Sequence, residues 1–83
     1  MVRYLVVKTS KKNGNKSVCN NGANYVNRLT AVRHLHINEM GKKASLFTYE
    51  VMAIPAYMVK INSLVHMWIR DDEETRAEIL NEI

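Results

Sequence analysis

Residues 2–9, VRYLVVKT, are rich in valine and tyrosine, residue types that favour the pleated surface of a β-strand. Successive side chains of a strand point to opposite faces, so the pattern can be examined face by face. Both faces of this segment are apolar in the middle and end in a polar group. The stretch therefore predicts a strand that is buried on much of both faces.

The segment after this strand contains two turn signals, Asn13-Gly14 and Asn21-Gly22. Asn-Gly pairs adopt the positive φ angles of tight turns at little steric cost. Lysines surround the first pair, which predicts a cationic hairpin tip. Residues 16–20 are expected to form a short edge strand between the two turns.

Residues 25–39 fit two patterns. At helical spacing the apolar side chains share one side, which predicts a helix near 24–33 with Asn24 as its N-cap. At a period of two, leucine and isoleucine alternate with polar residues, which predicts a strand near 29–38. Both alternatives stay open from the sequence.

A third pattern runs through the second half of the chain. Seven large apolar residues recur at alternating steps of four and three, which is typical of helical packing along one seam: Phe47, Val51, Ile54, Met58, Ile61, Val65 and Trp68. Pro55 divides the run, because proline is unfavourable inside a helix and favourable in its first turn. We expect a strand through about residue 53 and a helix over 55–70. A final helix over 72–82 is expected to begin with Asp71 and Glu74 as a capping pair.

These elements predict one α+β domain over residues 1–83. A small antiparallel sheet from the amino-terminal two-thirds is expected to pack against carboxy-terminal helices. A chain of this length has a thin core, so we also expect a homodimer in which the seven-residue stripe forms the interface.

The composition of the chain indicates in which cellular compartment it is expected. Cys19 is the only cysteine, so no disulfide can form within the chain, and a reducing cytoplasm is expected. The amino terminus lacks the pattern of a signal peptide. The longest apolar stretch, 51–69, is interrupted by proline and polar residues, so no membrane segment is predicted.

Charge is distributed unevenly along the chain. Residues 1–43 carry nine lysines and arginines and only one acidic residue, Glu39, a formal balance of +8, whereas residues 44–83 have a balance of −4. A cationic half of this kind favours a polyanionic partner. The predicted phosphate-contacting residues are Lys11, Lys12, Lys16, Arg28, Arg33, Lys42 and Lys43, with Arg3 and Lys8 as lesser candidates.

RNA is preferred over DNA as the polyanion, because no helix-turn-helix, zinc-finger or basic-zipper pattern is present. The sequence thus predicts a non-enzymatic RNA-binding protein. Its small size and its high content of asparagine and lysine suggest a phage or mobile-element accessory protein that neutralises an RNA-acting host enzyme, such as a toxin ribonuclease. The alternative is an inhibitor or adaptor whose basic face docks on an acidic host protein.

His34 and His36 form the one grouping of a catalytic or metal-binding type. On a strand the two imidazoles would share a face, with Cys19 or Glu39 completing a metal site or the histidines serving as acid and base. No spacing signature supports this chemistry. No catalytic residue, metal ligand or cofactor is therefore predicted.

Overall fold

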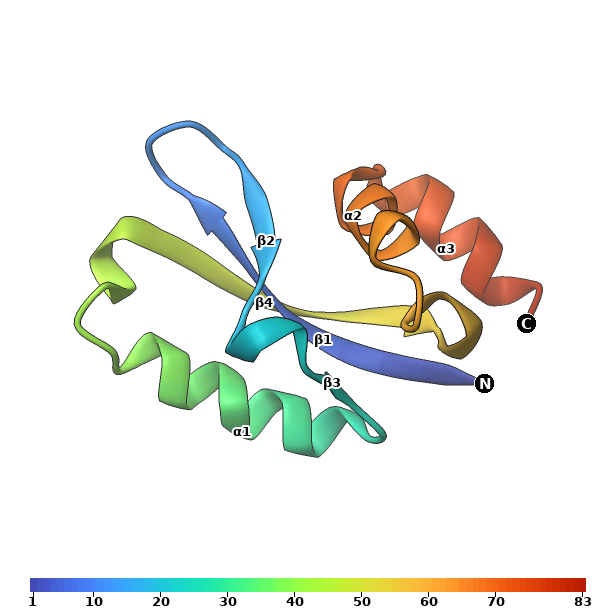
Figure 1. Ribbon diagram of the computed structural model, residues 1–83, viewed down its shortest axis with the longest axis horizontal. Helices are drawn as coiled ribbons and strands as arrows, with labels where there is room; N and C mark the ends of the chain where they lie inside the picture. Colours follow the sequence, from blue (N-terminus) through green and yellow to red (C-terminus); the bar gives the residue numbers. More distant parts are fainter.

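A computed structural model describes residues 1–83 and has four strands in one antiparallel sheet and three α-helices (Figure 1). The strands are β1 (Val2–Ser10), β2 (Lys16–Val18), β3 (Asn24–Tyr25) and β4 (Phe47–Pro55), and the helices are α1 (Arg28–Glu39), α2 (Asn62–Arg70) and α3 (Glu73–Asn81). Short 3-10 turns are η1 (Asn20–Gly22), η2 (Ala44–Leu46) and η3 (Ala56–Met58). The predicted α+β class is confirmed.

Strand β1 is the inner strand of the sheet. One edge of β1 pairs with β4 along its whole length, from Val2 opposite Pro55 to Ser10 opposite Phe47. The other edge pairs with β2 and then with β3, and between these two the Cys19 amide donates to the Val6 carbonyl. Residues 4–9 of β1 are therefore paired on both edges of the strand.

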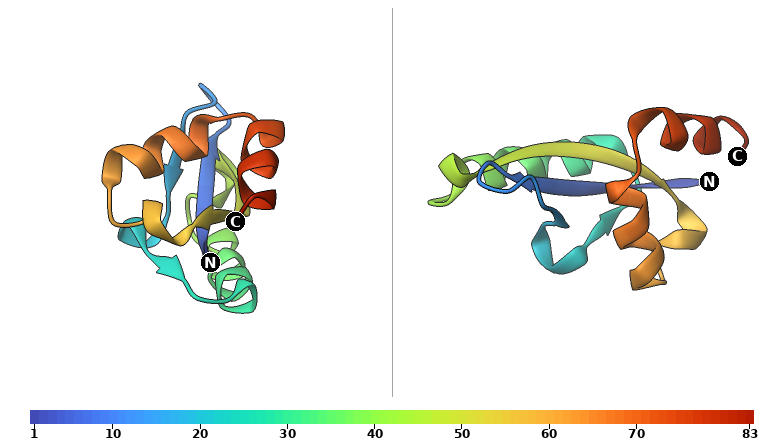
Figure 2. Two further views of the ribbon diagram at one scale, coloured as in Figure 1. Left: turned by 90° about the vertical axis from the view of Figure 1, so that its right-hand side faces the viewer. Right: turned by 90° about the horizontal axis from the view of Figure 1, so that it is seen from above.

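Helices cover both faces of β1. Leu5 and Val7 point to one face and pack against Trp68 and Ile69 of α2, whereas Val6 points to the other face and packs with Ala31 of α1. Figures 1 and 2 show the sheet between α1 and the α2–α3 pair. The predicted burial of both faces is confirmed, since Leu5, Val6 and Val7 are each at most 1% exposed.

Residues 25–39, for which the sequence left both a helix and a strand open, contain helix α1. It begins later than predicted because Asn24 belongs to β3, where it lies opposite Leu5. The N-cap is Asn27, whose Oδ1 accepts hydrogen bonds from the Thr30 amide at 2.9 Å and the Thr30 hydroxyl at 2.8 Å. The helix then continues through Glu39.

The long helix predicted from Pro55 is wrong in its first turns. Pro55 pairs with Val2 and is the last residue of β4, so it is held in an extended conformation. A 3-10 turn follows, and α2 begins only at Asn62. The apolar stripe is consequently not one helical seam: Phe47 and Val51 point to one face of β4, and Ile54 points to the other.

Helix α3 forms close to the predicted position, but with a different cap. The carboxylate of Asp72, not Asp71, accepts a hydrogen bond from the Thr75 amide at 2.8 Å. This hydrogen bond stabilises the charged form and lowers the pKa of the Asp72 carboxyl. None of the helices is both long enough and apolar enough to cross a membrane.

Candidate nucleic-acid interface

Lysines from two separate parts of the sequence meet at one end of the sheet. The loop between β1 and β2 carries Lys11 and Lys12, and the turn after α1 carries Lys42 and Lys43. A backbone hydrogen bond joins the two segments, from the Lys11 amide to the Leu46 carbonyl at 3.0 Å. Both segments lie at the left end of the molecule in Figure 1. We term this region the basic end, and it comprises Lys8, Lys11, Lys12, Lys16, Lys42 and Lys43.

The β1–β2 loop is fixed by hydrogen bonds within itself. The Ser10 amide donates to the Asn15 carbonyl at 2.9 Å, and the Ser10 hydroxyl accepts from the Lys12 amide at 3.2 Å. Gly14 has a φ of +74°, in the left-handed region that the Asn-Gly signal predicts. These hydrogen bonds hold the loop backbone in place, while the side chains of Lys11 and Lys12 are exposed.

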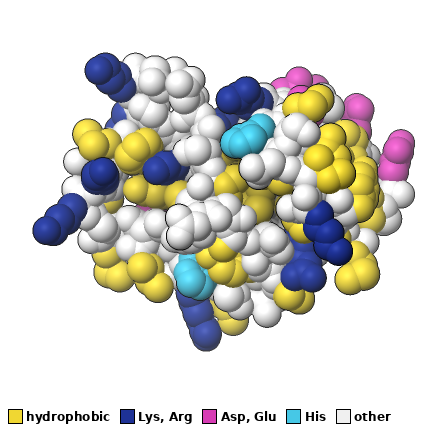
Figure 3. Space-filling model, viewed as in Figure 1, with side chains coloured by type: hydrophobic (Ala, Val, Ile, Leu, Met, Phe, Trp, Pro, Cys, Tyr) yellow, Lys and Arg dark blue, Asp and Glu magenta, His cyan; other side chains and the backbone are white.

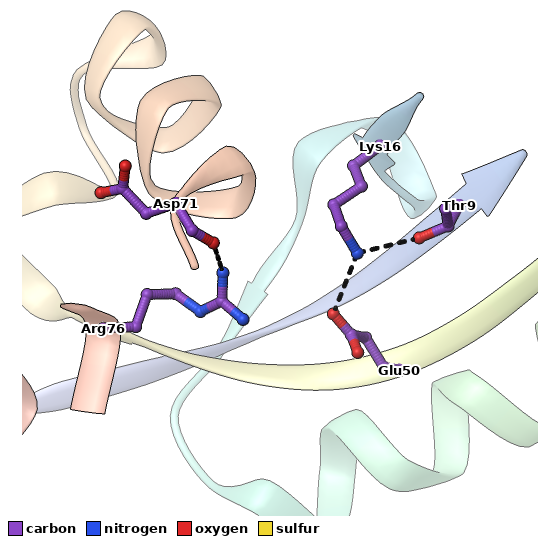
Figure 4. A network of polar contacts seen from close by, with 5 residues as sticks. All are labelled: Thr9, Lys16, Glu50, Asp71 and Arg76. Carbon is purple, nitrogen blue, oxygen red and sulfur yellow. Dashed lines mark hydrogen bonds and ion pairs between the residues drawn. The ribbon is translucent and has the colours of Figure 1, made fainter. Parts of the chain in front are cut away.

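Two lysines of the basic end already have partners. The Lys16 ammonium donates to the Thr9 hydroxyl at 3.1 Å and lies 3.6 Å from a carboxylate oxygen of Glu50 (Figure 4). The Lys8 ammonium lies 4.7 Å from the centre of the Phe47 ring, in a cation–π contact. Lys16 is thus partly neutralised, and the four lysines of the loop and the turn are the freest cations of the group.

Three predicted residues lie away from the basic end. Arg3 lies opposite Ile54 near the other end of β1. Arg28 is the first residue of α1, so the helix, about 18 Å long, separates it from the turn that carries Lys42. Arg33 is exposed midway along the same helix. The nine predicted residues therefore form a group of six and three separate arginines, not one continuous surface.

Acidic residues gather at the opposite end of the molecule. The exposed carboxylates of the tail lie at the start of α3 and along it: Asp71, Asp72, Glu73, Glu74, Glu78 and Glu82. Figure 3 shows the acidic atoms at the right, over α2 and α3, and several basic side chains at the left. The side-chain ion pairs are Lys16–Glu50 and His36–Glu39, so no carboxylate of the tail neutralises the basic end.

Arg76 lies among these acidic residues and makes a local contact with one of them. Its guanidinium donates to the backbone carbonyl of Asp71, as Figure 4 shows. This contact joins α3 to the end of α2 and leaves the carboxylates of that segment exposed.

The two histidines do not form a shared site. Because the segment is a helix, residues 34 and 36 point about 160° apart around its axis, and the predicted common strand face does not exist. The His34 ring stacks on Tyr25 with centroids 4.6 Å apart, and His36 lies 3.2 Å from a carboxylate oxygen of Glu39.

Burial raises the pKa of the Cys19 thiol, although Lys8 opposes this effect. No group of three or more His, Cys, Asp or Glu side chains is placed to hold a metal ion.

Two apolar residues, Leu46 and Phe47, also lie at the basic end, and the sequence did not predict them as part of it. Leu46 is 56% exposed and directly precedes Phe47, which packs near Tyr49 with ring centroids 6.3 Å apart. Phe47 was predicted to belong to the dimer interface, and Leu46 was not singled out. The available signal was the adjacent apolar pair Leu46-Phe47, only a few residues after the Lys42-Lys43 pair.

The other residues of the predicted dimer interface serve mainly the core of one chain. Ile54, Val65 and Trp68 are buried, with exposed fractions of 0%, 8% and 2%. Val51 and Met58 are partly buried against the two core clusters, and Ile61 is 50% exposed. The stripe therefore does not form a continuous exposed surface.

No family model, characterised protein or solved structure matches this chain. Its function must therefore be inferred from its own residues.

Proposed function

We propose that this protein binds RNA without acting as an enzyme, and that the basic end contacts the phosphate backbone. The observation that supports the proposal most is the hydrogen bond between Lys11 and Leu46, which holds two lysine-bearing segments together. Neither the Lys11-Lys12 pair nor the Lys42-Lys43 pair has a carboxylate partner. Four unpaired cations on two adjoining turns favour a ligand with closely spaced negative charges.

Binding of this kind has low sequence specificity. Lysine side chains contact phosphates as point charges, and such contacts position a ligand without reading its bases. An accessory protein that sequesters RNA, or that neutralises an RNA-acting host enzyme in the cytoplasm, fits this behaviour. The single cysteine supports the cytoplasmic location, since it does not depend on oxidising surroundings.

Filter binding to mixed-sequence RNA over a series of salt concentrations tests the proposal. If four lysines contact phosphates of a single strand, affinity should fall about 50-fold between about 50 mM and about 200 mM salt, because each contact releases condensed counterions. Binding that is insensitive to salt, or no binding at the lower concentration, contradicts the proposal. Capture of an acidic host protein without RNA binding would favour the adaptor alternative.

We also propose that the protein forms a homodimer, through a different surface from the predicted stripe. Leu29 and Ile37 lie one helical turn before and after Arg33 on the outer side of α1, and they are 62% and 60% exposed. This spacing is symmetric about Arg33, so two antiparallel α1 helices would match Leu29 with Ile37 of the partner subunit. The two arginines would repel each other at the centre, so salt or bound RNA should favour the dimer.

Sedimentation at micromolar concentration tests this proposal. We expect a mass twice the 9.6 kDa of one chain, and we expect Ile37→Glu to restore the mass of a single chain. A wild-type mass of 9.6 kDa, both with and without RNA, contradicts the dimer.

A further inference from the structure

We infer that the basic end holds an unpaired nucleotide, with its base against Leu46 and Phe47 and its phosphates near Lys11 and Lys12. The inference rests on the proposed RNA binding and specifies the class of ligand: single-stranded RNA and not a duplex.

The surface of the basic end is hollowed where its two segments meet. A hollow of about 400 Å³ lies there, and its lining residues are Ser10, Lys11, Lys12, Ser45, Leu46 and Phe47. The hydrogen bond from the Lys11 amide to the Leu46 carbonyl holds together the two backbone segments whose lysine and apolar side chains line this hollow. A volume of this size falls in the range that small-molecule sites occupy.

The lining combines the two kinds of surface that a nucleotide presents. The ammonium groups of Lys11 and Lys12 suit phosphate oxygens, and the exposed side chain of Leu46 with the Phe47 ring suits the apolar face of a base. Lys8 occupies a position over the Phe47 ring, so that one ring face is already covered and the base would approach from another side. The Ser45 side chain adds a hydroxyl that can hydrogen-bond to a base edge or a ribose hydroxyl.

A duplex cannot use this arrangement fully. Its bases are paired and stacked inside the helix, so only phosphates and sugars would reach the lysines, and Leu46 would remain exposed to water. An unpaired strand can turn one base into the hollow while its phosphates stay on the lysines. The exposed Leu46 side chain would then be covered by the apolar face of a base, which a duplex does not provide.

Fluorescence anisotropy with three labelled RNA probes of equal length and at one salt concentration tests the inference. The probes are a single strand, the same strand in a duplex, and a single strand with abasic positions. We expect the single strand to bind about tenfold more tightly than the abasic strand, because stacking against a protein side chain contributes substantially per base. We also expect it to bind more tightly than the duplex, although the duplex has a higher charge density.

Leu46→Ser should weaken binding of the single strand about fivefold while leaving the salt dependence and the binding of the abasic strand unchanged. Met67→Ser is the matched control, because Met67 is a similarly exposed apolar residue on α2, outside both the hollow and the proposed dimer surface, 63% against 56%. Circular dichroism would confirm that both variants are folded.

Equal affinity for the single strand and the abasic strand, or tighter binding of the duplex, overturns the inference. If the filter-binding series still shows that affinity for RNA falls steeply with salt, the proposed function stands. Absence of binding to all three probes overturns both. The comparison of probes uses the wild-type protein, so it decides the matter even if Leu46→Ser fails to fold.

Discussion

Replacing Trp68 with alanine is expected to lower the free energy of unfolding by about 3–5 kcal/mol. Trp68 is 2% exposed and lies in the cluster that contains Leu5 and Ile54, between the sheet and α2. Its indole nitrogen also donates to the Ala53 carbonyl of β4 at 2.9 Å. A chain of 83 residues has a total stability of only about 4–12 kcal/mol, so this loss would remove a large fraction of it.

Urea denaturation followed by circular dichroism measures this effect, and two variants provide comparison. Trp68→Phe keeps most of the apolar volume and removes the hydrogen bond, so it should cost less than the alanine variant. Met67→Ala changes the neighbouring residue, which is 63% exposed, and should have little effect. A loss below about 1 kcal/mol for Trp68→Ala would show that α2 does not pack on the sheet as described.

Reversing the charge of Lys11 and Lys12 together, as Lys11→Glu and Lys12→Glu, is expected to weaken RNA binding on the order of 100-fold. The change removes two phosphate contacts and places two carboxylates beside the ligand, so it adds repulsion to the lost attraction. The slope of log affinity against log salt should become shallower by about one or two, since each lysine contact contributes about 0.7 to it on a single strand.

A matched double variant separates local contact from net charge. Lys60→Glu and Arg70→Glu change the net charge by the same amount, from +4 to 0, at exposed positions before and at the end of α2. This control should weaken binding only a few-fold. Equal losses for the two double variants would mean that RNA responds to the total charge of the protein and not to the basic end.

The sequence predicts β1 well because its two faces can be examined independently, and both are apolar. It leaves α1 ambiguous for a physical reason: Leu29 and Ile37 are apolar and exposed, so apolar residues occur on both sides of the helix and conceal its period. The N-cap was misplaced because the pairing of Asn24 with β1 depends on a contact distant in sequence.

The apolar stripe shows how a helical spacing can arise without a helix. Phe47, Val51 and Ile54 match the spacing of a heptad, yet they point to different faces of β4. Pairing between Pro55 and Val2 keeps this segment extended, and this pairing joins residues that are 53 positions apart in the chain. Periodicity within the segment contains no information about that contact.

The lysines of the candidate site could be found from composition, whereas their grouping could not. The segments that carry Lys11 and Lys43 lie at one end of the sheet because the β1–β4 ladder brings them together, and the Lys11–Leu46 hydrogen bond joins them. Arg28 was included because it is close to other cations in sequence, but the length of α1 places it elsewhere.

Mapping the contact surface by NMR tests the central claim most directly. Single-stranded RNA would be added to isotopically labelled protein at low salt, and the shifts of the backbone amide signals would be followed. The account predicts the largest shifts in residues 8–16 and 42–47, with little change in α2 and α3. Largest shifts in residues 62–81, or shifts spread evenly over the chain, would contradict it.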